Sequence, residues 1–211
     1  MTRTRIKVCG ITSVAEARTV IDAGVDAIGM IFAESSRKVD LETVLEISAI
    51  APAWVTLVGV FVNPTSAAVD NAHLHGLIPQ FSGSEMPEFC EQAAGLRYLK
   101  VFHIQPGVQY HAVDFAELDA YAHATFMFDT SVGGKSGGTG VAFDWGVVKE
   151  LSRMRPVIVA GGLTPENVGA CVRHVRPFGV DVRSGVEMNG IKDEAKVRAF
   201  VRAVREADAE A

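Results

Sequence analysis

The sequence has few cysteines, no excess of basic residues and no long apolar run, and each shortage excludes a class of protein. The three cysteines, Cys9, Cys90 and Cys171, are far apart and odd in number, which fits reduced thiols better than a disulfide framework or a zinc site. The net charge of −5 and the absence of a basic stripe argue against nucleic acid as a partner. The longest apolar stretch, AWVTLVGVFV, is too short to cross a bilayer.

Two further absences concern metals and targeting. The six histidines lack the spacing of metal ligands, so we expect no metal site. The N-terminus MTRTRIKV is basic, but no apolar signal core follows it. We therefore expect a cytoplasmic protein that has no membrane partner.

Short apolar runs typical of strands alternate with helix-like segments along the whole chain. Eight strands, each followed by a helix, predict a parallel sheet with crossover helices, either a closed barrel or an open doubly wound sheet. The number eight favours a closed (β/α)8 TIM barrel in the α/β class, and no linker divides the chain, so we expect a single domain over residues 1–211. The strands are expected at Arg5–Cys9, Ala27–Phe32, Thr56–Val62, Leu77–Gln80, Tyr98–His103, Thr125–Phe128, Val157–Ala160 and Gly179–Val182.

Capping signals mark several helices. Ser13 and Glu16 have capping-box spacing, and Gly24 stands where that helix should end. Thr164, followed by Pro165, is expected to cap a later helix, and the last helix is expected over residues 193–207.

The alternation of the first and eighth strands predicts charges inside the barrel. Ile6 and Val8 should face the helices, while Lys7 and Cys9 should face inward. On the eighth strand Asp181 faces inward too. Because these strands are neighbours in a closed barrel, we expect Lys7 to pair with Asp181.

Three polar side chains follow strands at the carboxyl end of the barrel, where active sites of this fold lie. Cys9 ends the first strand, Arg37 follows the second and Asp129 follows the sixth. Each has an ordinary alternative: a core cysteine, a surface arginine and a turn or cap residue. At a barrel mouth, Arg37 can instead clamp a carboxylate and Asp129 can act as an acid.

Glycine-rich segments follow strands six to eight. The segment 133–140 contains GGKS but lacks the glycine that a nucleotide-binding loop needs at position 129, so we read it as a lid or a slack connector. The two later segments can hold a phosphate with backbone N–H groups. The residues expected there are Gly161, Gly162, Ser184 and Gly185, and Arg183 either reaches over the phosphate or bends into solvent.

Five motifs together resemble those of the phosphoribosylanthranilate isomerase family. They are KVCGIT at residues 7–12, FAESSR at 32–37, FDT…GGTGVAFDW within 128–145, AGGLTPENV at 160–168 and SGVE at 184–187. They span nearly the whole chain in order, and their combination is highly specific.

The resemblance implies a cofactor-free Amadori rearrangement in tryptophan biosynthesis, which converts N-(5-phosphoribosyl)anthranilate into its 1-deoxyribulose isomer. It implies Cys9 as general base, Asp129 as general acid, Arg37 as the group that holds the anthranilate carboxylate, and a phosphate site at the two glycine loops. We also expect Asp181 to contact the substrate. The expected partner is this phosphorylated small molecule, and the expected state is a monomer.

Two positions depart from the family pattern. Ser82 stands where the family usually has histidine, and Arg183 stands where it favours a small polar residue. Two alternative functions stay open. One is a paralogous isomerase acting on a related phosphoribosyl amine, which should need a second anion site, and the other is a non-catalytic phosphosugar-binding barrel.

Overall fold

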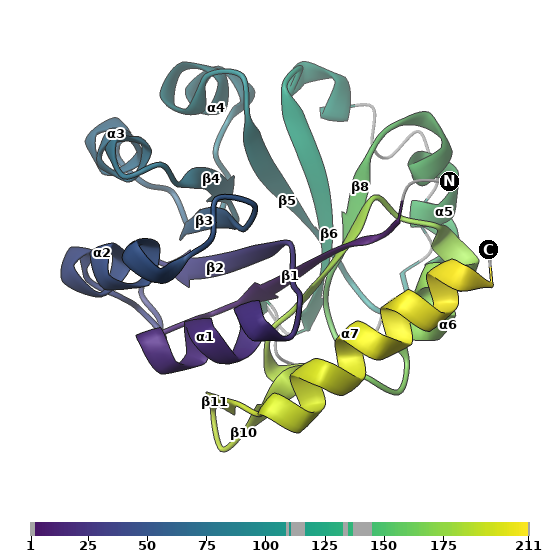
Figure 1. Cartoon of the computed structure of the whole chain (residues 1–211). Coiled ribbons are helices and arrows are strands. Elements are labelled where there is room, and N and C mark those ends of the chain that lie inside the picture. Colours follow the sequence, from purple (N-terminus) through teal and green to yellow (C-terminus); the bar gives the residue numbers. More distant parts are fainter. Residues whose placement is uncertain (1–2, 109, 111–116, 133–134, 137–144, 211) are drawn as a thin grey trace.

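The computed structural model describes residues 3–108, 110, 117–132, 135–136 and 145–210, and its centre is a closed barrel of eight parallel strands (Figure 1). Neighbours pair in the order β5-β4-β3-β2-β1-β9-β8-β6, and pairing of β5 with β6 closes the ring. The TIM-barrel prediction is therefore confirmed. The barrel strands are β1 (Arg5–Cys9), β2 (Ala27–Ile31), β3 (Thr56–Phe61), β4 (Ile78–Phe81), β5 (Tyr98–Ile104), β6 (Ala124–Val132), β8 (Val157–Val159) and β9 (Gly179–Val182).

Helices surround the barrel, as Figure 1 shows. They are α1 (Val14–Asp22), α2 (Leu41–Ile50), α3 (Ser66–Leu74), α4 (Pro87–Ala94), α5 (Gly146–Met154), α6 (Val168–Val175) and α7 (Glu194–Ala209). Among the described residues between β5 and β6 there is no α-helix, only a 3-10 turn at 117–120, so one of the expected helices is not found there. Within the described chain no helix has the length and apolarity to cross a membrane.

The predicted helix start is right at α1 and one turn too early at α6. Ser13 caps α1, and Gly24 follows that helix with a φ of +87°. Helix α6, however, begins at Val168, with Asn167 at its N-cap position but without a side-chain capping bond. The Thr164 hydroxyl accepts the Glu166 N–H at 3.3 Å and so caps the turn that precedes the helix. The Asn167 side chain explains the shift, because it accepts the Thr164 N–H at 2.8 Å and donates to the Gly162 carbonyl at 2.8 Å. It thus holds the intervening residues in a turn.

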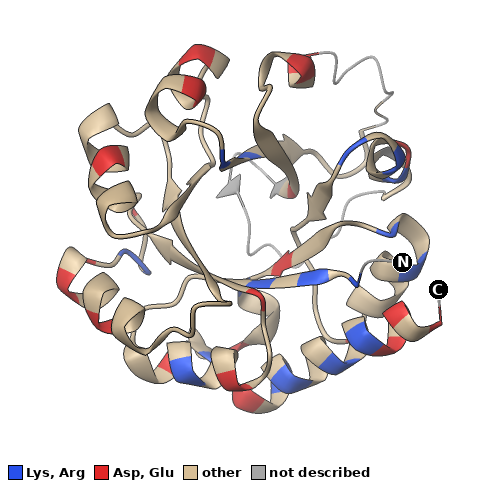
Figure 2. Ribbon diagram, turned by 45° about the horizontal axis from the view of Figure 1, so that its top comes forward, with Lys and Arg blue, Asp and Glu red and all other residues tan. Residues whose placement is uncertain are grey.

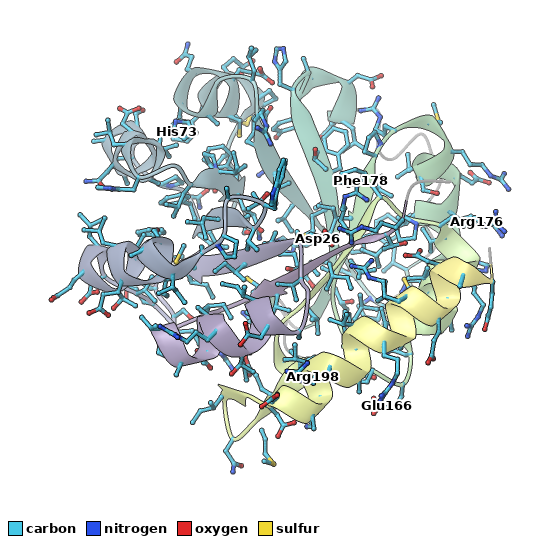
Figure 3. All side chains as sticks on the ribbon, viewed as in Figure 1. Asp26, His73, Glu166, Arg176, Phe178 and Arg198 are labelled. Atoms are coloured by element: carbon cyan, nitrogen blue, oxygen red, sulfur yellow. The ribbon has the colours of Figure 1, made fainter. Side chains whose placement is uncertain are left out.

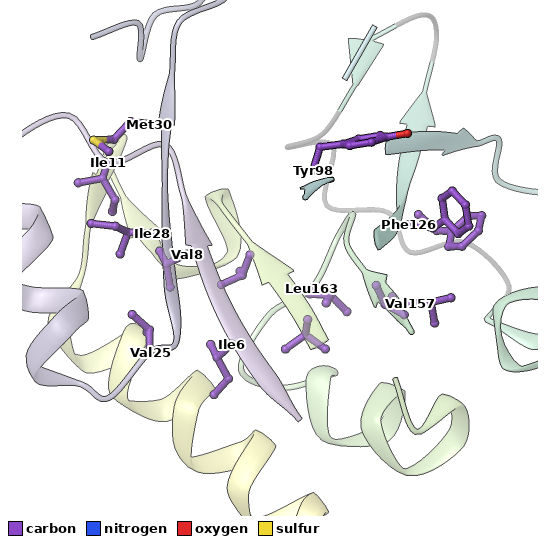
Figure 4. Close-up of a cluster of buried hydrophobic side chains, with 14 of the residues drawn as sticks. Ile6, Val8, Ile11, Val25, Ile28, Met30, Tyr98, Phe126, Val157 and Leu163 are labelled. Atoms are coloured by element: carbon purple, nitrogen blue, oxygen red, sulfur yellow. The ribbon is translucent and has the colours of Figure 1, made fainter. Parts of the chain in front are cut away.

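Strand alternation separates two apolar layers. Ile6 and Val8 belong to the large core between strands and helices, which Figure 4 shows in close-up. Cys9 instead lies in a small cluster inside the barrel with Ile31, Val58 and Val60. The predicted facing of the first strand is confirmed, and it delivers Cys9 to the barrel interior.

Charged residues gather on the outer helices, with a smaller number on the strands (Figure 2). Arg198 and Glu166 are exposed on that outer surface, whereas Asp26 lies beside β1 (Figure 3). The Asp26 carboxylate accepts the Ile6 N–H at 2.8 Å and bonds Arg205 at 3.4 Å. It therefore ties the start of β2 and α7 to β1.

Lys100 and Glu85 form a fully buried ion pair, with Nζ 2.7 Å from Oε2. Lys100 also donates to the Gly83 carbonyl at 2.8 Å, and Glu85 accepts the N–H of Asn63 at 2.7 Å. The pair holds together the segments that follow β3 and β4.

We expect Lys100→Met to lower the free energy of unfolding by about 3–5 kcal/mol, because it leaves the Glu85 carboxylate buried without its counter-charge. Urea denaturation measures the loss. The double variant Glu85→Gln/Lys100→Met should recover part of it, since no charge is then buried. A loss below about 1 kcal/mol in the single variant would contradict this account.

Candidate active site

A cavity of about 350 Å³ opens at the carboxyl ends of the barrel strands. Its lining comes from segments far apart in the sequence, which the closed barrel brings to one place. Eight of the nine residues predicted for the site line it: Cys9, Asp129, Gly161, Gly162, Asp181, Arg183, Ser184 and Gly185. Arg37 does not, although Ser35 of the same loop does.

The Cys9 thiol lies at the end of β1 and is only 6% exposed. It packs over Gly29, where an added Cβ would stand 2.9 Å from Cys9 Sγ and 3.0 Å from Lys7 Nζ, so only glycine leaves room for both groups. Burial raises the pKa of the Cys9 thiol, and Lys7 opposes this rise without cancelling it. Lys7 thus favours the thiolate, as the sequence predicts, but its effect on the pKa of Cys9 is smaller than the effect of burial.

Lys7 and Asp181 form the predicted pair inside the barrel. They are directly opposite in the register of β1 and β9, and Lys7 Nζ lies 2.7 Å from Asp181 Oδ1. Both side chains are 10% exposed or less. The ammonium therefore divides its attraction between the Asp181 carboxylate and the neighbouring thiol.

Asp129 is part of β6, which continues to Val132, four residues beyond the predicted end of this strand. Burial, followed by the charge of Asp181, raises the pKa of the Asp129 carboxyl to about 6, while His103 and Arg183 act in the opposite direction. Within the described part of the chain, the buried Oδ1 has no hydrogen-bond partner. The carboxyl can therefore carry a proton near neutral pH, as a general acid must.

The glycines after β8 and β9 allow two loops to pack against each other and against β6. Gly161 has a φ of +80°, and a Cβ there would lie 2.3 Å from the Thr130 backbone nitrogen. A Cβ on Gly185 would lie 1.9 Å from the Leu163 carbonyl oxygen. Only glycine fits at either position, and the result is a backbone-lined hollow beside Arg183 that suits an anion.

Arg37 contacts an acidic residue. Its Nε donates to Glu187 Oε1 at 3.1 Å, and its Nη2 bonds Glu187 Oε2. The Arg37 and Arg183 side chains both approach Gly10, at 3.0 Å and 3.4 Å from where its Cβ would be. The predicted role of Arg37 toward a substrate carboxylate stays a prediction, and Glu187 is the partner that the sequence did not reveal.

Sequence reasoning also missed His103 and Gln80, which line the cavity. His103 Nε2 donates to the Ser82 carbonyl at 3.0 Å, and Gln80 Nε2 donates to Ser82 Oγ at 3.1 Å. Strand alternation could have identified His103, because it shares the inward face of β5 with Leu99 and Val101. Ser82 lies between the two, on the cavity wall.

The predicted lid at 133–140 lies outside the described residues except for Lys135–Ser136, a two-residue strand β7 antiparallel to β6. Among the described residues there is no group of three or more His, Cys, Asp or Glu side chains that could hold a metal ion.

This chain is similar to known proteins over almost its full length. A family model described as N-(5'phosphoribosyl)anthranilate (PRA) isomerase matches residues 6–203. The N-(5'-phosphoribosyl)anthranilate isomerase of Moorella thermoacetica is 43% identical, covering 97% of this chain and 91% of the relative. That of Pseudomonas aeruginosa strain LESB58 is 44% identical, covering 97% of both chains.

Solved structures agree as well. The crystal structure of phosphoribosyl anthranilate isomerase from Thermotoga maritima superimposes with a TM-score of 0.83 at 32% identity, covering 96% of this chain and 99% of that one. A structure of phosphoribosyl anthranilate isomerase in complex with reduced 1-(o-carboxyphenylamino)-1-deoxyribulose 5-phosphate has a TM-score of 0.80 at 32% identity, with the same coverage. Because the family model and the curated relatives match nearly the whole sequence, and the solved structures match the fold, this chain belongs to the phosphoribosylanthranilate isomerase family.

Proposed function

We propose that this chain isomerises N-(5-phosphoribosyl)anthranilate to 1-(2-carboxyphenylamino)-1-deoxyribulose 5-phosphate, with Asp129 as general acid and Cys9 as general base. One observation carries the assignment: a thiol and a carboxyl of raised pKa line the same cavity as a glycine-built anion hollow. A phosphorylated sugar amine needs these three elements, and the chemistry needs no cofactor.

Asp129 acts first. Its proton goes to the ring oxygen of the furanose, the C1–O bond breaks, and the electron pair of the aryl amine nitrogen forms the Schiff base. A carboxyl with a pKa of about 6 holds this proton in part of the molecules at neutral pH, whereas one at the ordinary value of 3.8 would hardly do so.

Cys9 acts second. Its thiolate removes the proton from C2 of the sugar, the electron pair forms the C1–C2 double bond of an enolamine, and the iminium nitrogen becomes neutral. Tautomerisation, with a proton added at C1 and lost from the C2 hydroxyl, gives the ketone. Lys7 supplies the positive charge nearest the thiolate.

The two ends of the substrate are bound by separate groups. Backbone N–H groups of Gly161, Gly162, Ser184 and Gly185 receive the phosphate with Arg183 beside them, Arg37 receives the carboxylate, and Asp181 contacts the sugar. We also propose that the protein is a monomeric, single-domain cytoplasmic enzyme of tryptophan biosynthesis.

Cys9→Ala should lower kcat by about 10²- to 10⁴-fold, since solvent replaces a positioned base poorly. The decay of phosphoribosylanthranilate fluorescence in the presence of purified protein measures turnover. Cys171→Ala is the matched control, because Cys171 is a fully buried thiol on α6 outside the cavity lining. If Cys9→Ala stays folded and keeps near-normal turnover, Cys9 is only a core residue.

Asp129→Asn should also collapse kcat while making the fold more stable at pH 8. The folded-state pKa of about 6 lies above the ordinary 3.8, so the folded chain binds more protons between these values and its stability falls as pH rises through them. A neutral amide removes this penalty, on the order of 1–3 kcal/mol, and the gain should vanish below about pH 4. Thermal unfolding at pH 4 and pH 8 measures it, and an Asn variant that is less stable at pH 8 would assign Asp129 to structure.

Arg183→Ser should raise KM about tenfold, because it removes one partly exposed charge-assisted contact to the phosphate. Inorganic phosphate should inhibit the variant less, and its KM should depend less on salt. Arg198→Ser, on the exposed face of α7, is the control. Unchanged KM and unchanged phosphate inhibition would leave Arg183 without a role in binding.

A further inference from the structure

The contact between Arg37 and Glu187 leaves part of the guanidinium available. Glu187 is bonded to Nε and Nη2, which form one edge of the planar group. A guanidinium has five N–H donors, so three remain, and two of them, on Nη1 and Nη2, form the adjacent edge. That edge has the geometry for a second bidentate carboxylate, so Glu187 orients Arg37 without using it up.

Lys192 keeps the charge of Arg37 from being cancelled. Its Nζ lies 2.7 Å from Glu187 Oε1, and the two side chains are 0% and 5% exposed. Two cations and one carboxylate leave the trio of Arg37, Glu187 and Lys192 with one net positive charge. Lys192 therefore makes the surroundings of Arg37 more favourable for an anion than an Arg37–Glu187 pair alone, which would be neutral, and the Glu16 carboxylate beside Lys192 offsets part of this gain.

A tight hairpin places Glu187 beside Lys192. Strands β10 (Glu187–Met188) and β11 (Ile191–Lys192) pair in antiparallel register, with Glu187 opposite Lys192. The connecting Asn189 and Gly190 have φ values of +53° and +81°, as expected of an Asn-Gly hairpin turn. The sequence MNGI between the two charged residues thus dictates that they lie side by side.

The hairpin also joins the two substrate-binding regions. Lys192 Nζ donates to the Arg183 carbonyl at 3.2 Å, directly before the 3-10 turn η2 (Ser184–Val186) of the phosphate hollow. The Lys192 N–H donates to Glu16 of α1 at 3.0 Å, which fixes the hairpin to the barrel. Glu187 then reaches from this fixed hairpin to Arg37 in the loop after β2.

We propose that Glu187, neutralised by Lys192, is a positioning residue that holds Arg37 for the carboxylate of the substrate and fixes that carboxylate site relative to the phosphate hollow. The inference rests on the proposed function and deepens it. It predicts that carboxylate recognition depends on two residues that need not touch the substrate.

The test compares two ligands by isothermal titration: reduced 1-(o-carboxyphenylamino)-1-deoxyribulose 5-phosphate and the same compound without the carboxyl group. The preference for the first is the ratio of their Kd values. The key variant is Glu187→Gln/Lys192→Met, because its trio keeps the net charge of +1. A lost preference in this variant therefore reports orientation and not charge.

We expect the double variant to lose about tenfold or more of the preference, as misplaced binding groups do. The Kd of the carboxyl-free compound should rise less than that of the carboxylated one, because the only contact to the phosphate hollow that Lys192→Met removes is the one to the Arg183 carbonyl. KM for phosphoribosylanthranilate should rise more than kcat falls. In an Arg37→Ala background, the same double variant should cause no further loss. Glu187→Asp, which keeps the charge but shortens the side chain, should lose part of the preference and serves where the double variant does not fold.

Glu85→Gln/Lys100→Met is the matched control, because it removes an equally buried Glu–Lys pair that does not contact Arg37. It should leave the preference unchanged whatever its effect on stability. An unchanged preference in both Glu187 variants, or equal losses for both ligands, overturns the positioning role. A wild-type protein that neither isomerises phosphoribosylanthranilate nor binds either compound overturns the proposed function instead.

Discussion

The ion pair between Lys7 and Asp181 is the charged contact inside the barrel on which both proposed reacting groups depend, after burial itself. Lys7 Nζ on β1 lies 2.7 Å from Asp181 Oδ1 on β9, and both side chains are buried. Asp181 raises the pKa of both Cys9 and Asp129, and Lys7 lowers that of Cys9. Gly29 is part of the same arrangement, since any side chain there would displace the ammonium and the thiol together.

Buried lysines recur around the mouth of the barrel, each paired with a carboxylate. Lys100 pairs with Glu85 and also binds the Gly83 carbonyl, while Lys192 pairs with Glu187 and also binds the Arg183 carbonyl. Buried ion pairs add little net stability compared with apolar residues of the same size. Their common effect here is to fix loops, because each lysine binds a carboxylate and a backbone carbonyl of the same segment, after β4 for Lys100 and after β9 for Lys192.

Periodicity and strand order made most of the fold predictable, and with it the position of most candidate site residues at the cavity. Alternation along β1 and β9 was enough to place Cys9, Lys7 and Asp181 inside, because a barrel interior admits only every second residue. Side-chain contacts between distant segments were not predictable in this way. Nothing in the sequence near Arg37 points to Glu187, 150 residues later, and the start of α6 was missed because Asn167 bonds backward to Gly162.

The ion pair also bears on how an acid and a base with unfavourable pKa values can work together. At neutral pH the Cys9 thiol is mostly protonated and the Asp129 carboxyl, with a pKa of about 6, is mostly ionised, which is the reverse of what the proposed chemistry uses. The reaction needs molecules that carry the Cys9 thiolate and the protonated Asp129 carboxyl together. Between the two pKa values the fraction of such molecules is constant, because the protonated carboxyl decreases tenfold per pH unit while the thiolate increases tenfold.

Transfer of one proton from thiol to carboxylate converts the resting pair into the competent pair with no exchange of protons with solvent. The Lys7–Asp181 pair favours this transfer at both groups, because the effect of Lys7 on the thiol exceeds the opposing effect of Asp181 there. Its positive end lies nearest the thiol and stabilises the thiolate, and the charge of Asp181 favours the protonated form of Asp129. A single buried dipole thus biases base and acid in the directions that the reaction requires.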